Sequence, residues 1–335
     1  MNEPMRAPRR NLPEEYREVS IVHIKDPTAI GDSMEVLNMD VINLDREAFE
    51  YKQITVPLEE CCLIYQWSNA ALRTRTRVHK NFDACFVLGP QARGSIDGTA
   101  LHPYALIAAG PGAQGEVVID SHYENIVLLV SPQILARHLA LRGKKGAFVI
   151  PEEYEVWHPT AEVARALFEL GTRIVEAAEN NPAIFNDSRR ARYGAQVEFM
   201  DSLFATIESC APDESVEAGR KGKSYSQIVR ACEAYTLKLD GRRPYLSELC
   251  NTARVSERTL QVAFKHIMGM SPLAYLHRLR LHRARDELRK AKSGTTTVTD
   301  VAMNWGFWHF GEFSRTYRNC FGELPSSTLK RNSGG

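Results

Sequence analysis

The hydrophobic pattern of this 335-residue chain changes its period near Ser131. Before that point, apolar and polar residues alternate in short runs separated by Gly and Pro, which is typical of β-strands joined by turns. After it, apolar residues recur every three or four positions, as they do along one face of an α-helix. We therefore expect an α+β protein, with an N-terminal β-barrel or jelly-roll-like domain followed by helices only.

The length and the breaks in the pattern predict four segments. A chain of 335 residues is too long for one ordinary core and favours two domains. We expect a β-rich ligand-sensing domain over 1–130, a helical dimerisation segment over 131–210 and an all-α domain over 225–335. A polar stretch without periodicity, 211–224, is expected to link them.

One apolar seam runs through the last part of the helical segment. Its members step by four and three residues, the spacing of a narrow stripe that packs on another helix: Tyr193, Val197, Met200, Phe204 and Ile207. The stripe favours a dimerisation helix, so one expected partner is a second copy of the chain. A helix packed on its own domain is the alternative.

Charge is distributed unevenly along the chain. From Lys221 to the C-terminus there are 20 Lys and Arg against 9 Asp and Glu, a balance of +11, which leaves −10 for the first 220 residues. A basic domain is the electrostatic signature of a nucleic-acid partner. No stretch approaches the roughly 20 apolar residues that a membrane span needs, and the N-terminus lacks the apolar core of a signal peptide. We expect a cytoplasmic protein with no membrane partner.

The reactive side chains form no catalytic or metal-binding pattern. Seven cysteines, an odd number without a CxxC pair, argue against a disulfide framework and a structural zinc site. His79, His102 and His122 are isolated, so the spacing of a cupin metal site is not met. No GxSxG elbow and no phosphate-binding loop occurs. We expect a protein that is not an enzyme and holds no metal and no cofactor.

Residues 245–269 have the pattern of a helix-turn-helix unit. A short amphipathic helix leads to a tight connection at Ala253–Val255, and the Ser256 hydroxyl can cap the helix that follows. The apolar face of that second helix is formed by Leu260, Ala263, Phe264 and Ile267. Its outward positions are then Glu257, Arg258, Gln261, Val262 and Lys265.

The same layout is repeated at residues 298–322. An apolar helix leads to a turn at Gly306 and then to a helix with Phe310, Phe313 and Tyr317 on its core face. A long basic amphipathic helix over 272–292 joins the two units and would hold them at a fixed separation. One such unit is a weak signal, whereas the repeat favours DNA binding.

These residues resemble the AraC/XylS family of transcription regulators over about 225–332. The tail of the family pattern is visible in Gly306-Phe307, Phe313-Ser314-Arg315, Tyr317-Arg318 and the FGELPS sequence at 321–326. The upstream half is visible in Ser256, Arg258, Leu260, Phe264-Lys265, Gly269, Ser271-Pro272 and Arg280-Leu281. The resemblance implies a homodimeric, ligand-responsive regulator that inserts two recognition helices into adjacent major grooves of double-stranded promoter DNA, about 34 Å apart.

The family pattern also implies which side chains meet the DNA. The base readers would be Arg258, Gln261 and Val262 in the first unit, and His309, Phe310, Gly311, Ser314 and Arg315 in the second. The phosphate binders would be Lys265, Arg318, Arg278 and Arg283. Two positions depart from the pattern, because Val262 stands where many relatives carry Arg and Gly311 weakens the second recognition helix.

One strand of the N-terminal domain carries an unusual run of cations. Strand alternation in LRTRTRVHK places Arg73, Arg75, Arg77 and His79 on one face. Guanidiniums this close repel one another unless an anion or several carboxylates lie between them. The spacing of Arg73 and Arg77, followed by Arg93, Ser95 and Gly98, is similar to the cyclic di-GMP signature of PilZ domains, except that Arg93 stands where that signature has an acidic or amide residue.

We therefore expect a small anionic effector, cyclic di-GMP or another phosphate-bearing anion. Its binding residues would be Arg73, Arg75, Arg77, Arg93, Ser95 and Gly98. Such a regulator would resemble the CuxR-like members of the family. The alternatives are a small acidic metabolite, an acidic protein partner that makes the regulator ligand-independent, and an exposed edge strand that uses charge to block aggregation.

Overall fold

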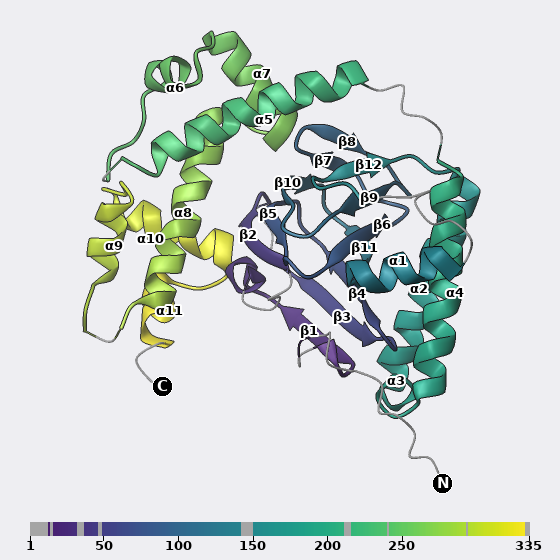
Figure 1. The fold of residues 1–335 in the computed structure, drawn as a ribbon. Coiled ribbons are helices and arrows are strands. Elements are labelled where there is room, and N and C mark those ends of the chain that lie inside the picture. Colours follow the sequence, from purple (N-terminus) through teal and green to yellow (C-terminus); the bar gives the residue numbers. More distant parts are fainter. Residues whose placement is uncertain are drawn as a thin grey trace.

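The structure is a computed structural model that describes residues 13, 16–31, 37–45, 49–141, 150–210, 216–239, 241–292 and 294–331. A two-sheet sandwich lies in the middle of the molecule. The helices between residues 132 and 208 lie to its right in Figure 1, and the C-terminal helices lie to its left and above it. Among the described residues, no helix combines the length and the apolar character needed to cross a membrane.

The described strands form two antiparallel sheets. The order in the larger sheet is β1 (Ser20–Ile24), β3 (Tyr51–Pro57), β4 (Cys61–Ser68), β11 (Tyr123–Val130), β6 (Asp83–Leu88), β9 (Leu106–Ala109) and β12 (Glu155–Trp157). The order in the smaller sheet is β2 (Leu37–Asn43), β5 (Leu72–Val78), β10 (Gln114–Ile119), β7 (Gly94–Ile96) and β8 (Thr99–Leu101). The predicted β-rich domain is confirmed. No register among the described residues joins the two sheets, so a barrel is not confirmed.

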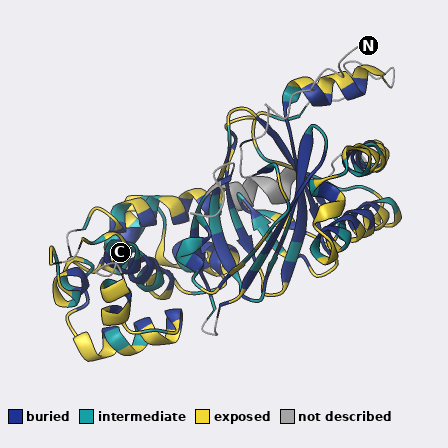
Figure 2. Cartoon of the chain, turned by 90° about the horizontal axis from the view of Figure 1, so that it is seen from below, coloured by how far each residue is buried: buried dark blue, intermediate teal, exposed yellow. Residues whose placement is uncertain are grey.

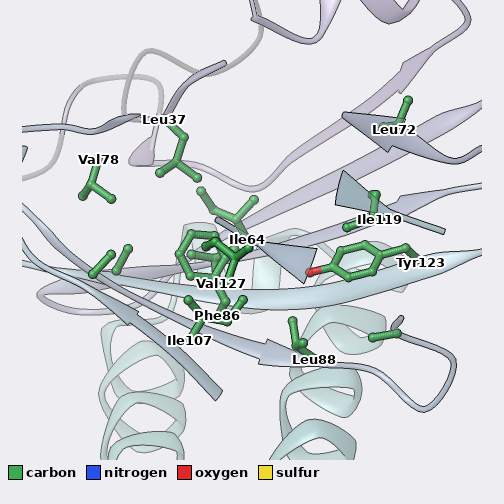
Figure 3. Close-up of a cluster of buried hydrophobic side chains, with 14 of the residues drawn as sticks. Leu37, Ile64, Leu72, Val78, Phe86, Leu88, Ile107, Ile119, Tyr123 and Val127 are labelled. Carbon is green, nitrogen blue, oxygen red and sulfur yellow. The ribbon is translucent and has the colours of Figure 1, made fainter. Parts of the chain in front are cut away.

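Apolar side chains from the inner faces of both sheets make the core of the sandwich. Figure 3 shows this cluster, to which the smaller sheet contributes Leu37, Leu72 and Ile119, and the larger sheet contributes Ile64, Phe86, Ile107 and Val127. The alternation of strand side chains explains the arrangement, because every second residue of each strand points inward. The strand interiors are accordingly the buried part of the molecule in Figure 2.

Helices cover the outer face of the larger sheet. These are α1 (Pro132–Leu141), α2 (Ala161–Asn180), α3 (Ala183–Asn186) and α4 (Arg189–Glu208), and α4 begins where the Ser188 hydroxyl accepts a hydrogen bond from the Ala191 amide. The segment expected to be wholly helical, 131–210, also contains β12, which adds to the edge of the larger sheet.

The apolar seam of α4 packs mainly on its own domain. Met200 and Phe204 are buried against the larger sheet and α2, and Ile207 packs beside them, whereas Tyr193 is 56% exposed. The alternative of an intramolecular helix therefore fits most of the stripe. The reason is that the outer face of the larger sheet is apolar and needs a cover, which a spacing of three and four residues serves as well as it serves a coiled coil.

The C-terminal part is entirely helical among its described residues. Its helices are α5 (Val216–Thr236), α6 (Leu246–Ala253), α7 (Glu257–Met268), α8 (Pro272–Lys290), α9 (Val298–Asn304), α10 (Phe310–Phe321) and α11 (Pro325–Arg331). Helix α5 begins inside the stretch expected to be a linker, 211–224, whose first five residues lie outside the described part. The expectation of an irregular linker is thus wrong from Val216 onward, since glycine weakens a helix but does not end it.

Candidate functional site

The first helix-turn-helix unit is formed by α6 and α7. Arg254 ends α6 in the left-handed conformation, with a φ of 54°, and the Ser256 hydroxyl caps α7 by accepting from the Thr259 amide at 3.2 Å. A non-glycine residue in that conformation is uncommon and makes the turn sharp. The buried face of α7 is the expected one, formed by Leu260, Ala263, Phe264 and Ile267.

The second unit, α9 and α10, turns at Gly306. Its φ is +76°, and a Cβ there would lie 2.7 Å from the Gly241 carbonyl oxygen, so the position requires glycine. Phe313 and Tyr317 are buried as expected, but Phe310 is 42% exposed and does not belong to the core face. As the first residue of α10, Phe310 lies at the entry to the helix rather than over its centre.

The side chains predicted to read or bind DNA lie on accessible faces of α7 and α10. Arg258, Lys265, His309, Arg315 and Arg318 are exposed, and Gln261 and Ser314 are partly exposed. Val262 is 44% exposed, so its apolar side chain is accessible to a partner. Both recognition helices thus present the expected residues to the outside.

Trp308 is an exposed residue that the sequence reasoning missed. It stands just before α10 with 62% of its surface exposed, next to the exposed Phe310. The signal in the sequence was an aromatic side chain directly after the Gly306-Phe307 turn. Because an indole can pack on a thymine methyl group, Trp308 belongs to the candidate interface.

Two of the expected phosphate binders are engaged elsewhere. Arg278 donates to the carbonyl oxygens of Asn43 at 3.0 Å and Asp45 at 2.6 Å, and Arg283 forms a two-pronged ion pair with Asp40. Both contacts join α8 to β2 of the sandwich or to the residues directly after it. In this arrangement neither guanidinium is available to a DNA phosphate, contrary to the expectation.

The arginine strand β5 faces the helical domain and meets carboxylates there. Arg73 has no exposed surface and pairs with Asp40 at 3.0 Å, Glu116 at 3.5 Å and Glu233 of α5 at 2.9 Å. Arg75 pairs with the same Glu116 and Glu233. Tyr275 of α8 also donates to Glu233. We name Arg73, Arg75, Asp40, Glu116 and Glu233 the ion cluster. In it, several carboxylates lie between the guanidiniums of the strand, which is one of the two arrangements expected to offset their repulsion.

The remaining residues of the expected anion site do not converge with the cluster. Arg77 is exposed and pairs in register with Gln114, at the start of β10, whereas Ser95 lies across from Val118 near its end. Arg93 is exposed just before β7, and Gly98 lies in the turn that follows that strand. At about 3.3 Å per strand residue, the two ends of β10 are too far apart for Arg77 and Arg93 to hold one small anion together.

A cavity of about 60 Å³ lies between the two sheets. Its described lining residues are uncharged and mostly apolar, among them Phe86, Ile107 and Val117. Two polar atoms in it, Asn125 Oδ1 and the Tyr154 hydroxyl, are buried and have no hydrogen-bond partner among the described residues. Burial raises the pKa of Tyr154, so that hydroxyl stays protonated and can donate.

The cavity can therefore take a small neutral molecule. A ligand hydroxyl can satisfy either polar atom, by donating to Asn125 Oδ1 or by accepting from the Tyr154 hydroxyl. Sequence reasoning missed both residues. The available signal was a lone Asn within the apolar strand YENIVLLV; nothing marked Tyr154.

No group of acidic, histidine and cysteine side chains suited to a metal occurs among the described residues. Cys61, Cys62 and Cys85 are buried in the larger sheet, and burial raises the pKa of Cys85 to about 12. Such a thiol stays protonated and is a poor nucleophile.

The pKa of Asp40 gives a test of the ion cluster. Burial alone would raise it, but the hydrogen bonds and charges of Arg283 and Arg73 outweigh burial and lower it from 3.8 to about 2. The contribution of ionised Asp40 to the stability of the folded state is therefore complete above about pH 4, and it is lost as the pH falls through about 2. Asp40→Asn should cost about 2 kcal/mol of unfolding free energy at pH 6 and clearly less at pH 2.5, measured by denaturant titration. An equal cost at both pH values would contradict this linkage.

The comparisons with known proteins concern mainly the helical domain. A helix-turn-helix domain family matches residues 249–331. The probable thc operon regulatory protein of Rhodococcus erythropolis is 35% identical over 104 residues, 31% of each chain. The XylDLEGF operon transcriptional activator 1 of Pseudomonas putida is 34% identical over 126 residues, 37% of each chain. The matched region thus spans about a third of these relatives.

Two solved structures are also similar to parts of the chain. A probable AraC family transcriptional regulator from Rhodopseudomonas palustris is 37% identical, over 32% of this chain and 97% of that one, with a TM-score of 0.29. The AraC-like transcriptional activator CuxR is 12% identical, over 80% of this chain and 96% of that one, with a TM-score of 0.39. The C-terminal domain is therefore a helix-turn-helix domain similar to those of AraC/XylS-type transcription regulators.

Proposed function

We propose that this protein is a transcription regulator that binds promoter DNA through α7 and α10 and responds to a small effector. The observation that carries the proposal is the pair of helix-turn-helix units, each with an exposed recognition helix and joined by the single helix α8. Two such helices held by one connecting helix suit two successive major grooves on one face of the duplex. The basic balance of the domain supplies the attraction to phosphates. Since related proteins carry the name of activators, activation is the proposed output.

The roles of individual side chains follow from their chemistry. Arg258 and Gln261 have the donors and acceptors to read base edges in the first unit, and Arg315 has them in the second. Val262, Trp308 and Phe310 offer apolar surface to thymine methyl groups. Lys265 and Arg318 contribute charge to phosphate binding and carry no sequence choice.

Substitutions in α7 separate these roles. Arg258→Ala or Gln261→Ala should weaken binding to a duplex selected from a random pool by about 1–3 kcal/mol, and binding to unrelated duplex much less. Lys265→Ala should weaken both alike and reduce the salt dependence. Fluorescence anisotropy at several salt concentrations measures both effects. Equal losses on selected and unrelated duplex for Arg258→Ala and Gln261→Ala would remove the base-reading assignment.

The proposed effector is a small, neutral and largely apolar molecule that carries a hydroxyl group. It would occupy the cavity between the sheets, where the described lining has no charge and two buried polar atoms are unsatisfied. A phosphate-bearing anion, cyclic di-GMP included, is the second candidate. It would meet either Arg77 or Arg93, which are both exposed but lie at opposite ends of β10. The ion cluster disfavours a binding site at Arg73 and Arg75, whose charges carboxylates already balance.

Calorimetric titration with two probes decides between the effectors. We expect 2-propanol, which carries a hydroxyl group and is small enough for a cavity of about 60 Å³, to bind, and cyclic di-GMP not to bind. Ile107→Phe, which fills the cavity, should abolish binding of 2-propanol. Binding of cyclic di-GMP alone, lost in Arg77→Ala, would replace the first candidate by the second.

A homodimer remains part of the proposal, with α4 as its site. Tyr193 and Val197 are the members of the apolar seam that the chain's own core leaves exposed or half-exposed. Tyr193→Glu should give monomers in sedimentation, because it places a charge on an apolar contact, while Glu198→Gln on the same helix should not. A dimer that survives Tyr193→Glu would place the interface elsewhere.

A further inference from the structure

The outer face of the smaller sheet is occupied by the DNA-binding domain. Ile42, Leu44 and Val118 share one buried apolar cluster with α5, α7 and α8. The first helix-turn-helix unit thus has a core that is partly built from the sandwich. Figure 1 shows α5 and α8 beside the smaller sheet, with β2 next to α8.

Charged contacts run along the whole length of α8. Arg278 binds the carbonyls of Asn43 and Asp45, Arg283 pairs with Asp40, and Arg285 pairs with Asp26 at 2.5 Å. Arg289 donates to the Thr28 carbonyl at 2.8 Å, and His282 accepts from the Asn43 amide at 3.2 Å. With the ion cluster on α5, these contacts hold the helical domain on the sandwich by both of its long helices.

The contact near Asp45 lies between the two recognition helices. A groove of about 740 Å³ is lined by Leu44 and Asp45 of the sandwich, by Arg278 of α8 and by Arg315 and Asn319 of α10. A second groove, of about 450 Å³, places the same Leu44 and Asp45 next to the C-terminal end of α7. The end of β2 is therefore inserted between the recognition helices, against the helix that joins them.

That position conflicts with DNA. When two recognition helices enter successive major grooves, the sugar-phosphate backbone that separates the grooves lies between them. Here, Leu44 and Asp45 of the sandwich lie in that place, next to Arg315 of α10 and to the end of α7. The carbonyls of Asn43 and Asp45 occupy the Arg278 guanidinium, and the Asp40 carboxylate occupies that of Arg283. The acidic sandwich thus takes the place of phosphates.

We propose that this docked arrangement is the DNA-excluding state of the protein, and that DNA binding requires release of α8 from β2. The inference rests on the proposed function and adds its regulation. The free energy that holds α8 on β2 opposes DNA binding. The apparent affinity for DNA equals the intrinsic affinity multiplied by the fraction of molecules in which α8 is released.

The effector cavity and the docking surface share three strands. In β2, β5 and β10, Met39, Thr74, Thr76 and Val117 line the cavity, while the alternate residues Asp40, Arg73, Arg75 and Glu116 carry the ion cluster on the other face. A ligand that shifts these strands displaces the carboxylates and guanidiniums on their outer face. An effector can in this way change the docking equilibrium without contact with the DNA-binding domain.

The test uses sandwich-side variants of the full chain, which leave the DNA-binding domain unaltered. Asp40→Asn and Asp26→Asn remove the partners of Arg283 and Arg285 at nearly constant volume. The double variant should bind a duplex selected by the wild-type protein about tenfold more tightly at constant salt. Glu169→Gln, an exposed position on α2, makes a matched control because it removes a negative charge from the opposite side of the sandwich.

The outcomes are distinct. Tighter binding by the Asp26 and Asp40 variants, with Glu169→Gln equal to wild type, supports the docked state as DNA-excluding. Equal or weaker binding by a double variant whose circular dichroism and melting show a folded chain overturns it. If neither the wild type nor any variant binds duplex DNA at low salt, the proposed function fails, and that result differs from an unchanged affinity of a protein that does bind.

Discussion

Arg73 is a fully buried guanidinium, and a buried charge is stable only when opposite charges and hydrogen bonds replace the water it has lost. Its three carboxylate partners come from three parts of the chain: Asp40 from β2, Glu116 from β10 and Glu233 from α5. This requirement ties the smaller sheet to the helical domain. Removing any one partner would leave Arg73 undercompensated, which costs more than an ordinary surface ion pair contributes.

Because side chains alternate along a β-strand, the two faces of the smaller sheet have different neighbours. Residues of β5 alternate between the interior of the sandwich and the contact with α5 and α8, so a single strand meets both an apolar cavity and a polar interface. Among the described residues, the buried polar atoms without a hydrogen-bond partner fall into the same two places. Asn125 and Tyr154 lie at the cavity, whereas Asn43 and His282 lie at the interface between the domains. Incomplete hydrogen bonding is thus concentrated where the structure would have to change.

The sequence predicted local chemistry well and long-range pairing poorly. The turn at Gly306, the cap at Ser256 and the faces of α7 were predictable because they depend on neighbours within one or two helical turns. The alternation of side chains along β5 was also predicted correctly. The carboxylate that pairs with Arg73 lies 160 positions away in the sequence, so the arginines of the strand were interpreted as a ligand site. Of the two predicted forms, β-barrel or jelly-roll-like, the barrel is not confirmed, because alternation defines faces and leaves sheet closure open. The seam of α4 was ambiguous for a similar reason, since an apolar stripe does not specify what covers it.

The two helix-turn-helix units have different degrees of independence. The core of the second unit, around Phe313, Tyr317 and Leu288, contains only residues of the C-terminal domain among those described. The core of the first includes Ile42, Leu44 and Val118 from the sandwich. Exchange of C-terminal domains between relatives would therefore transplant the second unit intact but would divide the core of the first. A functional chimera would have to carry these three apolar residues along, which limits how freely evolution can combine sensors with DNA-binding domains in proteins built this way.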